Sequence, residues 1–127
     1  MPLITILVED NKTIRETLVP ALEELANARV VAIAATAAGA KQALERWHGQ
    51  WQLIVVDLFL AAGSGLEVLQ AIRQRSAHQH VFVLSNYATA DMRRRCLELG
   101  ADAVFDKSTE LDAFFEQCMA LPDPDAR

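Results

Sequence analysis

Polar side chains that could do chemistry stand at the ends of short apolar segments in this chain. Glu9 and Asp10 follow the first segment, Asp57 follows the third, Ser85 ends the fourth, and Lys107 comes shortly after the fifth. An acid at a strand end is common, so each residue alone indicates little. Together, three carboxylates repel one another unless a cation compensates them, and hard oxygen ligands suit Mg²⁺. The set therefore predicts a magnesium site with a hydroxyl and an ammonium group beside it.

The five apolar segments have the composition of strands that are covered on both faces of a parallel sheet. They are Leu3–Val8, Val30–Ala34, Leu53–Val56, Val81–Leu84 and Ala103–Phe105. Between them, apolar residues recur at helical spacing, as Ile14, Leu18, Leu22 and Leu25 do in the first interval. The pattern predicts five alternating strand and helix units.

Strict alternation of strands and helices predicts an α/β fold with right-handed crossovers and a doubly wound, five-stranded parallel sheet. We expect the strand order 2-1-3-4-5 in a three-layer sandwich. The functional crevice of such a sheet lies beyond the carboxyl ends of its strands, where the strand order reverses. The first and third strands are neighbours there, so Glu9, Asp10 and Asp57 are expected to meet.

Local signals predict where several helices begin or end. Thr13 or Thr36 can cap a helix start, and the loop Gly63–Gly65 precedes the third helix. Gly100 stands where the fourth helix should end. Pro20 lies inside the first helical pattern, where a proline removes a backbone hydrogen bond at a cost of about 3 kcal/mol. We expect a kink or a late helix start there.

The composition, 52% hydrophobic and 23% charged residues, is typical of one globular domain. No apolar stretch approaches the roughly 20 residues that cross a bilayer. The range Met1–Val8 has no basic leader, so we expect no secretory signal and a cytoplasmic location. The formal net charge of -5 disfavours direct binding to nucleic acid.

Two further features attract attention because of their residue types. The run Arg93–Arg95 is interpreted as a solvated helix face, with the docking of an acidic partner as the sharper alternative. Cys96 and Cys118 stand at apolar helix positions without a CxxC spacing, and we interpret them as core thiols.

Four separate stretches resemble the receiver domains of bacterial response regulators, the phosphoacceptors of two-component signalling. These stretches are Ile4–Asn11, Leu53–Leu58, Val81–Ser85 and Gly100–Lys107. The resemblance spans Leu3 to about Leu121 and implies a single flavodoxin-like receiver domain over residues 1–121. Residues 122–127 would then form a C-terminal tail.

The resemblance implies a Mg²⁺ site at the strand ends. Asp10 and Asp57 would bind the ion directly, together with the backbone carbonyl of Phe59. Glu9 would act directly or through water.

The resemblance also implies how the phosphoryl group is handled. Asp57 would be the nucleophile that accepts it from a histidine kinase or a histidine phosphotransfer protein. Lys107 would hold one phosphoryl oxygen, and Ser85 would donate its hydroxyl to the group once it is attached. The switched surface would comprise the fourth helix, fifth strand and fifth helix, with a downstream protein or a phosphorylation-dependent dimer as its partner.

The sequence departs from the family pattern near Lys107. Many receivers carry an aromatic residue three positions earlier, where this chain has Val104. Phe105 points to the other face of its strand and is assigned to the core. Ser108 follows Lys107 where proline is frequent, so we expect Ser108 or Thr109 to cap the fifth helix.

Bulky residues flank the expected phosphoryl site. They are Phe59 and Tyr87, and Asn86 stands where a small residue is frequent. Asn86 can either restrict access to Asp57 or only form a local hydrogen bond. The bulky side chains of Phe59 and Tyr87 hinder the water that hydrolyses an acyl phosphate, so we expect slow self-dephosphorylation.

Two other functions compete with a phosphoacceptor. An aspartyl-nucleophile phosphatase usually needs a second acid two residues after the nucleophile, and Phe59 occupies that position. A degenerate receiver that only binds proteins would normally have lost Asp10, Asp57 or Lys107, and all three are present. We therefore expect a phosphoacceptor rather than a turnover enzyme.

Overall fold

The chain folds into alternating strands and helices within residues 2–86 and 88–122, which the computed structural model describes. In chain order these are β1 Leu3–Val8, α1 Lys12–Leu25, β2 Ala28–Ala34, α2 Ala37–Arg46, β3 Leu53–Val56, α3 Gly65–Ala71, β4 His80–Ser85, α4 Ala90–Glu98, β5 Ala103–Asp106 and α5 Leu111–Ala120. The predicted α/β alternation is confirmed. The expected tail lies outside the described residues from position 123 onward.

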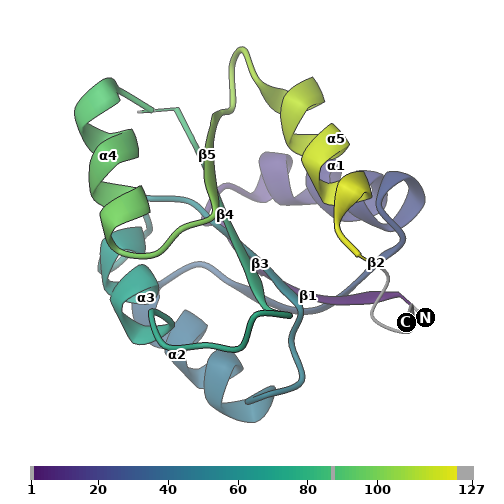
Figure 1. Cartoon of the computed structure of the whole chain (residues 1–127), viewed down its shortest axis with the longest axis horizontal. Coiled ribbons are helices and arrows are strands. Elements are labelled where there is room, and N and C mark those ends of the chain that lie inside the picture. Colours follow the sequence, from purple (N-terminus) through teal and green to yellow (C-terminus); the bar gives the residue numbers. More distant parts are fainter. Residues whose placement is uncertain (1, 87, 123–127) are drawn as a thin grey trace.

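All four strand pairings are parallel, and the sheet order is β2-β1-β3-β4-β5, as predicted. Helices α1 and α5 cover one face, and α2, α3 and α4 cover the other (Figure 1). The order reverses between β1 and β3, where Val8 pairs with Val56. Residues that follow these two strands must therefore lie close together.

Apolar side chains form a separate core on each face of the sheet. Ile6 and Val8 pack with residues of α2, α3 and α4, such as Leu69. Leu7 points the other way and packs with residues of α1 and α5, such as Phe114. This alternation is the period of two of a strand. Burying each such side chain contributes about 1.5–3 kcal/mol, so both faces hold the strand ends in place.

Helix α1 differs from its predicted start. Asn11, not Thr13, is its N-cap, and the Asn11 side chain accepts a hydrogen bond from the Ile14 N–H at 3.0 Å. The helix runs from Lys12 to Leu25 and contains Pro20, so the expectation of a helix that starts only at the proline is wrong. Pro20 is exposed, and burial of Leu18 and Leu22 on the opposite side offsets the backbone hydrogen bond lost at the proline.

Leu25 lies in α1, as its helical spacing predicts, but it is the last residue and is 53% exposed, so the buried part of the stripe ends one turn earlier. One further prediction on helices was wrong. Neither Ser108 nor Thr109 caps α5: Glu110 is its N-cap and makes no side-chain capping bond. The Ser108 N–H instead donates to Asp106 Oδ1 at 2.7 Å within the preceding turn.

The remaining local signals are confirmed. The Thr36 hydroxyl caps α2 by accepting from the Gly39 N–H at 3.0 Å. Gly100 follows the end of α4 with a φ of 101°, a conformation that favours glycine. The loop before α3 is also found, although it ends at the N-cap Ser64, and Gly65, which was expected in the loop, is the first residue of the helix.

The two residues in question on β5 face opposite cores, as predicted. Val104 belongs to the core beneath α2, α3 and α4. Phe105 belongs to the other core, where its ring lies 5.6 Å from those of Phe82 and Phe114 in edge-to-face contact. Phe105 is therefore a packing residue.

Among the described helices, none is both long and apolar enough to cross a membrane.

Candidate functional site

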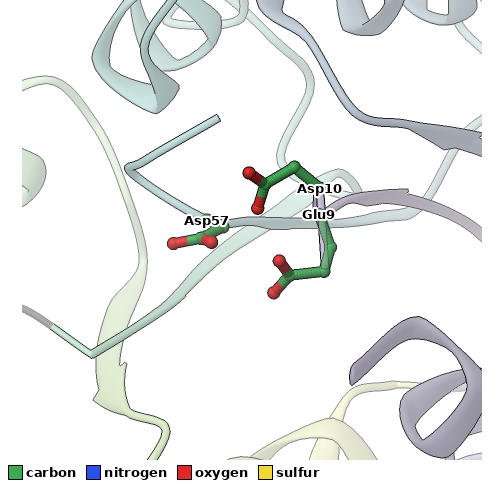
Figure 2. Close-up of side chains that lie close together, drawn as sticks. All are labelled: Glu9, Asp10 and Asp57. Atoms are coloured by element: carbon green, nitrogen blue, oxygen red, sulfur yellow. The ribbon is translucent and has the colours of Figure 1, made fainter. Parts of the chain in front are cut away.

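The carboxyl ends of β1 and β3 bring three acids together. Glu9 directly follows β1, Asp10 comes next, and Asp57 directly follows β3. One carboxylate oxygen from each lies within 4.8 Å of the others, and Figure 2 shows the three side chains converging. Glu9 is 1% exposed and Asp57 6%, whereas Asp10 is exposed. The predicted acidic cluster is therefore confirmed as geometry.

Lys107 reaches this cluster from the loop between β5 and α5. Its ammonium group donates to Asp57 Oδ2 at 3.0 Å and also contacts Glu9 Oε1. Its backbone N–H donates to the Ser85 carbonyl at 3.1 Å, which ties the ends of β4 and β5 together. Lys107 thus contacts the acids that follow β1 and β3, and it lies 50 residues after Asp57 in the sequence.

The electrostatics of Glu9 and Lys107 depend on their burial and on each other. Burial raises the pKa of Glu9, and the hydrogen bonds from Lys107 and from the Asn11 N–H only partly offset it. Burial alone would lower the pKa of Lys107, but the hydrogen bonds and charges of Glu9 and Asp57 outweigh it and raise that pKa. Two carboxylates contact this ammonium group, and the third, that of Asp10, lies beside them. Three carboxylates beside one ammonium group are an excess of negative charge that favours a divalent cation.

The donor set and the space beside it fit Mg²⁺. Every candidate ligand in the cluster is a carboxylate oxygen, which suits a hard cation. A cavity of about 200 Å³ adjoins it, lined by Glu9, Asp10, Asn11, Ile14, Asp57, Phe59, Asn86 and Lys107. The cavity has room for a hydrated ion and a phosphoryl group.

The other two predicted site residues occupy different positions. Phe59 lines the cavity with a side chain that is 52% exposed, and its N–H lies 3.4 Å from Asp57 Oδ1. The role of its carbonyl stays a prediction. Ser85 is fully buried at the end of β4 and is not among the described residues lining the cavity. Tyr87 lies outside the described residues.

Sequence reasoning missed Gly65 as a residue of the site. Its N–H donates to the Leu58 carbonyl at 2.9 Å, so the start of α3 lies directly against the strand end that carries Asp57. A Cβ at Gly65 would lie 2.3 Å from the Asp57 carbonyl oxygen and 2.8 Å from the Leu58 Cα. The available signal is a glycine between Asp57 and the third helix, where it permits a close backbone approach as well as a turn.

Asn11 and Arg15 also support the site without having been predicted. The Asn11 N–H donates to Glu9 Oε2 at 3.0 Å, and Arg15 Nη1 donates to the Glu9 carbonyl at 3.1 Å. Both come from the start of α1, so this end of the helix holds Glu9 through its carboxylate and its carbonyl. An asparagine after two acids was the available signal.

Comparisons with known proteins agree with this geometry. The family model described as the response regulator receiver domain matches residues 5–118. The non-phosphorylated HemR receiver domain from Leptospira biflexa is 29% identical, with a TM-score of 0.80 over 99% of this chain and 100% of that one. No sequence among the curated proteins matches significantly.

Two solved structures of lower identity share the fold. A chain of the CheX–CheY–BeF3–Mg²⁺ complex from Borrelia burgdorferi is 16% identical, with a TM-score of 0.83 over 94% of this chain and 88% of that one. A Burkholderia pseudomallei response regulator with a phosphorylated aspartic acid, a calcium ion and citrate is 23% identical, with a TM-score of 0.75 over 94% and 66%. With its fold, its acidic strand ends and the family match over residues 5–118, this chain belongs to the response regulator receiver domain family.

Proposed function

We propose that the chain is a phosphoacceptor of a two-component phosphorelay that takes a phosphoryl group on Asp57. The observation that carries the proposal is the contact of the Lys107 ammonium group with both Asp57 and Glu9, at the rim where Asp10 completes the acidic cluster. The proposed nucleophile Asp57, the acids that would bind a metal ion, and the Lys107 ammonium group that would contact the phosphoryl group then line one cavity.

The transfer is an in-line displacement at phosphorus. An Asp57 carboxylate oxygen forms a bond to phosphorus as the bond to the donor histidine nitrogen breaks, and that nitrogen keeps the electron pair. Lys107 neutralises charge on a phosphoryl oxygen. Bound by Asp10, Asp57 and the Phe59 carbonyl, with Glu9 directly or through water, Mg²⁺ would supply further charge neutralisation and orientation of the phosphoryl oxygens.

Structures of similar proteins support the chemistry. The Burkholderia regulator carries a phosphorylated aspartic acid, and the Borrelia complex contains BeF3 and Mg²⁺. We infer that a histidine kinase or phosphotransfer protein in the cytoplasm donates to this chain. The attached group would then bias Ser85 and the surface of α4, β5 and α5 toward a target protein or a second copy.

Two observations favour this function over its rivals. The residue two positions after Asp57 is Phe59, which cannot act as an acid or a base. We therefore expect no turnover of phosphoesters and no phosphatase activity. Lys107 and Asp57 are in hydrogen-bond contact, so the site has the groups that a degenerate receiver lacks.

The test is incubation of the chain with Mg²⁺ and acetyl phosphate, followed by intact-mass measurement. The wild type is expected to gain the mass of one phosphoryl group and Asp57→Asn to gain none, because an amide is no nucleophile. Beryllofluoride should perturb the NMR spectrum of the wild type alone. A wild type that changes in neither experiment would sink the proposal, and steady hydrolysis of p-nitrophenyl phosphate would point to the phosphatase.

A further inference from the structure

The three consecutive arginines of α4 do not share one environment. Arg94 is 68% exposed, pairs with Asp91 and lies 3.9 Å from Glu98, and Arg95 is exposed as well. Arg93 instead turns toward β5 and is only 34% exposed. The interpretation of the run as a solvated face is therefore wrong for Arg93, and the reason lies in its hydrogen bonds.

The guanidinium group of Arg93 connects three segments of the chain. Its Nε donates to the Ala88 carbonyl at 2.9 Å, and its Nη1 donates to the Val104 carbonyl at 3.0 Å. Its Nη2 donates to the Glu110 carboxylate. A planar fork with several fixed donors can hold such a set of acceptors, which the ammonium group of a lysine cannot match.

Glu110 passes this connection on to the turn that carries Lys107. Glu110 Oε1 also accepts the Asp106 N–H at 3.0 Å, and the Glu110 N–H donates to the Asp106 carbonyl at 2.9 Å. The hydrogen bond from Arg93 lowers the pKa of Glu110, which keeps it charged. The carboxylate is thus committed to Arg93 and to Asp106, which explains why α5 begins without a side-chain cap.

The clamp formed by Arg93 and Glu110 joins the two loops that flank the phosphoryl site. Ala88 stands three residues after Ser85, and Asp106 directly precedes Lys107. Movement of either loop must therefore strain or break hydrogen bonds of Arg93. Val104, at the position where many receivers have an aromatic residue, has only an aliphatic side chain and contributes its carbonyl to this clamp.

We propose that Arg93, acting through Glu110, is a positioning residue for phosphoryl transfer: it fixes Lys107 against Asp57 and couples the Lys107 loop to the loop after Ser85. This inference rests on the proposed function, since it concerns the same site. Arg93 contacts no reacting atom and acts through Lys107.

The first experiment measures the rate of phosphorylation of the full chain by acetyl phosphate at saturating Mg²⁺. Arg93→Ala and Glu110→Gln are each expected to lower this rate by about tenfold or more, because displacement of a catalytic group by about 1 Å can cost a hundredfold. Arg94→Ala, which removes only exposed ion pairs beside Arg93, is the matched control and should stay within twofold of wild type. Circular dichroism checks that each variant is folded.

Two readouts separate positioning from general loosening. Mg²⁺ affinity should not weaken in Arg93→Ala, because the acids that bind the ion are not in contact with the clamp. The double variant Arg93→Ala/Lys107→Ala should be no slower than Lys107→Ala, since both changes act through one ammonium group. Weakened Mg²⁺ binding, or multiplied effects in the double variant, would overturn the inference.

The failure of the inference can be told from that of the proposed function. A wild type that takes up no phosphoryl group contradicts the function itself. Normal uptake by wild type together with an unchanged rate in Arg93→Ala and Glu110→Gln overturns only the positioning role. In NMR spectra, Arg93→Ala should shift the amide signals of Thr89, which shares a peptide group with the Ala88 carbonyl, and of Asp106. Arg94→Ala should not shift them. Unshifted signals in Arg93→Ala would contradict the clamp even if one variant folds poorly.

Discussion

Lys107 balances the charge of two buried carboxylates. Its own side chain is 9% exposed, and those of Glu9 and Asp57 are 2% and 8% exposed. Water screens such a group of charges weakly, so each member depends on the others. The residue that would assist phosphoryl transfer is therefore also a determinant of stability.

We predict that Lys107→Ala lowers the free energy of unfolding by about 3 kcal/mol, because it leaves buried carboxylates without a counter-ion. Urea denaturation without divalent cations measures this. Lys12→Ala, which removes an exposed partner of Glu16, is the control and should cost less than about 1 kcal/mol. Added Mg²⁺ should restore part of the loss, because a ligand of the native state stabilises it. Equal effects of the two substitutions would contradict the prediction.

Of the two bulky residues expected beside Asp57, Phe59 lies in the described part of the chain and lines the cavity beside the acidic cluster. We predict slow self-dephosphorylation of the wild type and a loss at least severalfold faster in Phe59→Ala, because a smaller side chain admits the attacking water. The decay of the phosphorylated species by intact mass measures both rates. Leu97→Ala, an exposed apolar residue on α4, is the control. A wild-type lifetime of only seconds would rule the prediction out.

At the residue scale, the sequence was sufficient for the acids and for Lys107, because each stands at a strand end and parallel strands end on one rim. It was not sufficient for Arg93. Three arginines in a row look alike in sequence, and only the positions of the Ala88, Val104 and Glu110 acceptors distinguish the first from its neighbours.

At the scale of elements, the start of α3 is packed against the end of β3 without space for a side chain. The close approach at Gly65 puts the helix backbone against the Asp57 carbonyl. Helix α3 thus supports the backbone of Asp57.

We predict that Gly65→Ala lowers the free energy of unfolding by about 1–3 kcal/mol, the usual cost of overpacking, and also slows phosphorylation. The physical reason is that the new Cβ would displace the Asp57 carbonyl. Thermal or urea unfolding and acetyl phosphate uptake measure the two effects. Gly49→Asn is the control, since Gly49 has a φ of 73°, which asparagine tolerates, and open space around it. Wild-type behaviour of Gly65→Ala would contradict the packing argument.

The elements themselves were largely predictable because their periodicity of two or 3.6 residues reflects which side is buried. Their ends were less so. Asparagine and threonine are both favourable N-cap residues, so the sequence alone does not decide between Asn11 and Thr13. The structure shows that the helix begins at Lys12, directly after Asn11. The cap predicted at Ser108 or Thr109 was wrong: the N-cap is Glu110, whose side chain binds Arg93, a residue distant in sequence that no local signal reveals.

At the scale of the whole molecule, the sheet separates two cores, and each contains one cysteine. Cys96 lies in the core beneath α2, α3 and α4, and Cys118 in the core beneath α1 and α5. Both thiols are buried, in agreement with the sequence interpretation. Burial raises the pKa of Cys96 and raises that of Cys118 to about 12.

We predict that neither thiol reacts with Ellman's reagent in the native protein at pH 8, because reaction needs an accessible thiolate and both groups stay protonated and buried. Absorbance should report no rapid reaction before denaturant is added and two thiols per chain afterwards. The variant Ser108→Cys, at an exposed position, supplies the positive control for the reagent. Fast labelling of the wild type would contradict the packing of these cores.

The distance in sequence between Asp57 and Lys107 has a consequence for incomplete chains. A fragment that ends before β5, whether released early during synthesis or cut by a protease, keeps the acceptor aspartate but loses its ammonium partner. Such a fragment also lacks the strand that pairs with β4. We therefore expect such a fragment to take up no phosphoryl group. Only chains that include β5 and Lys107 would respond to the phosphoryl donor.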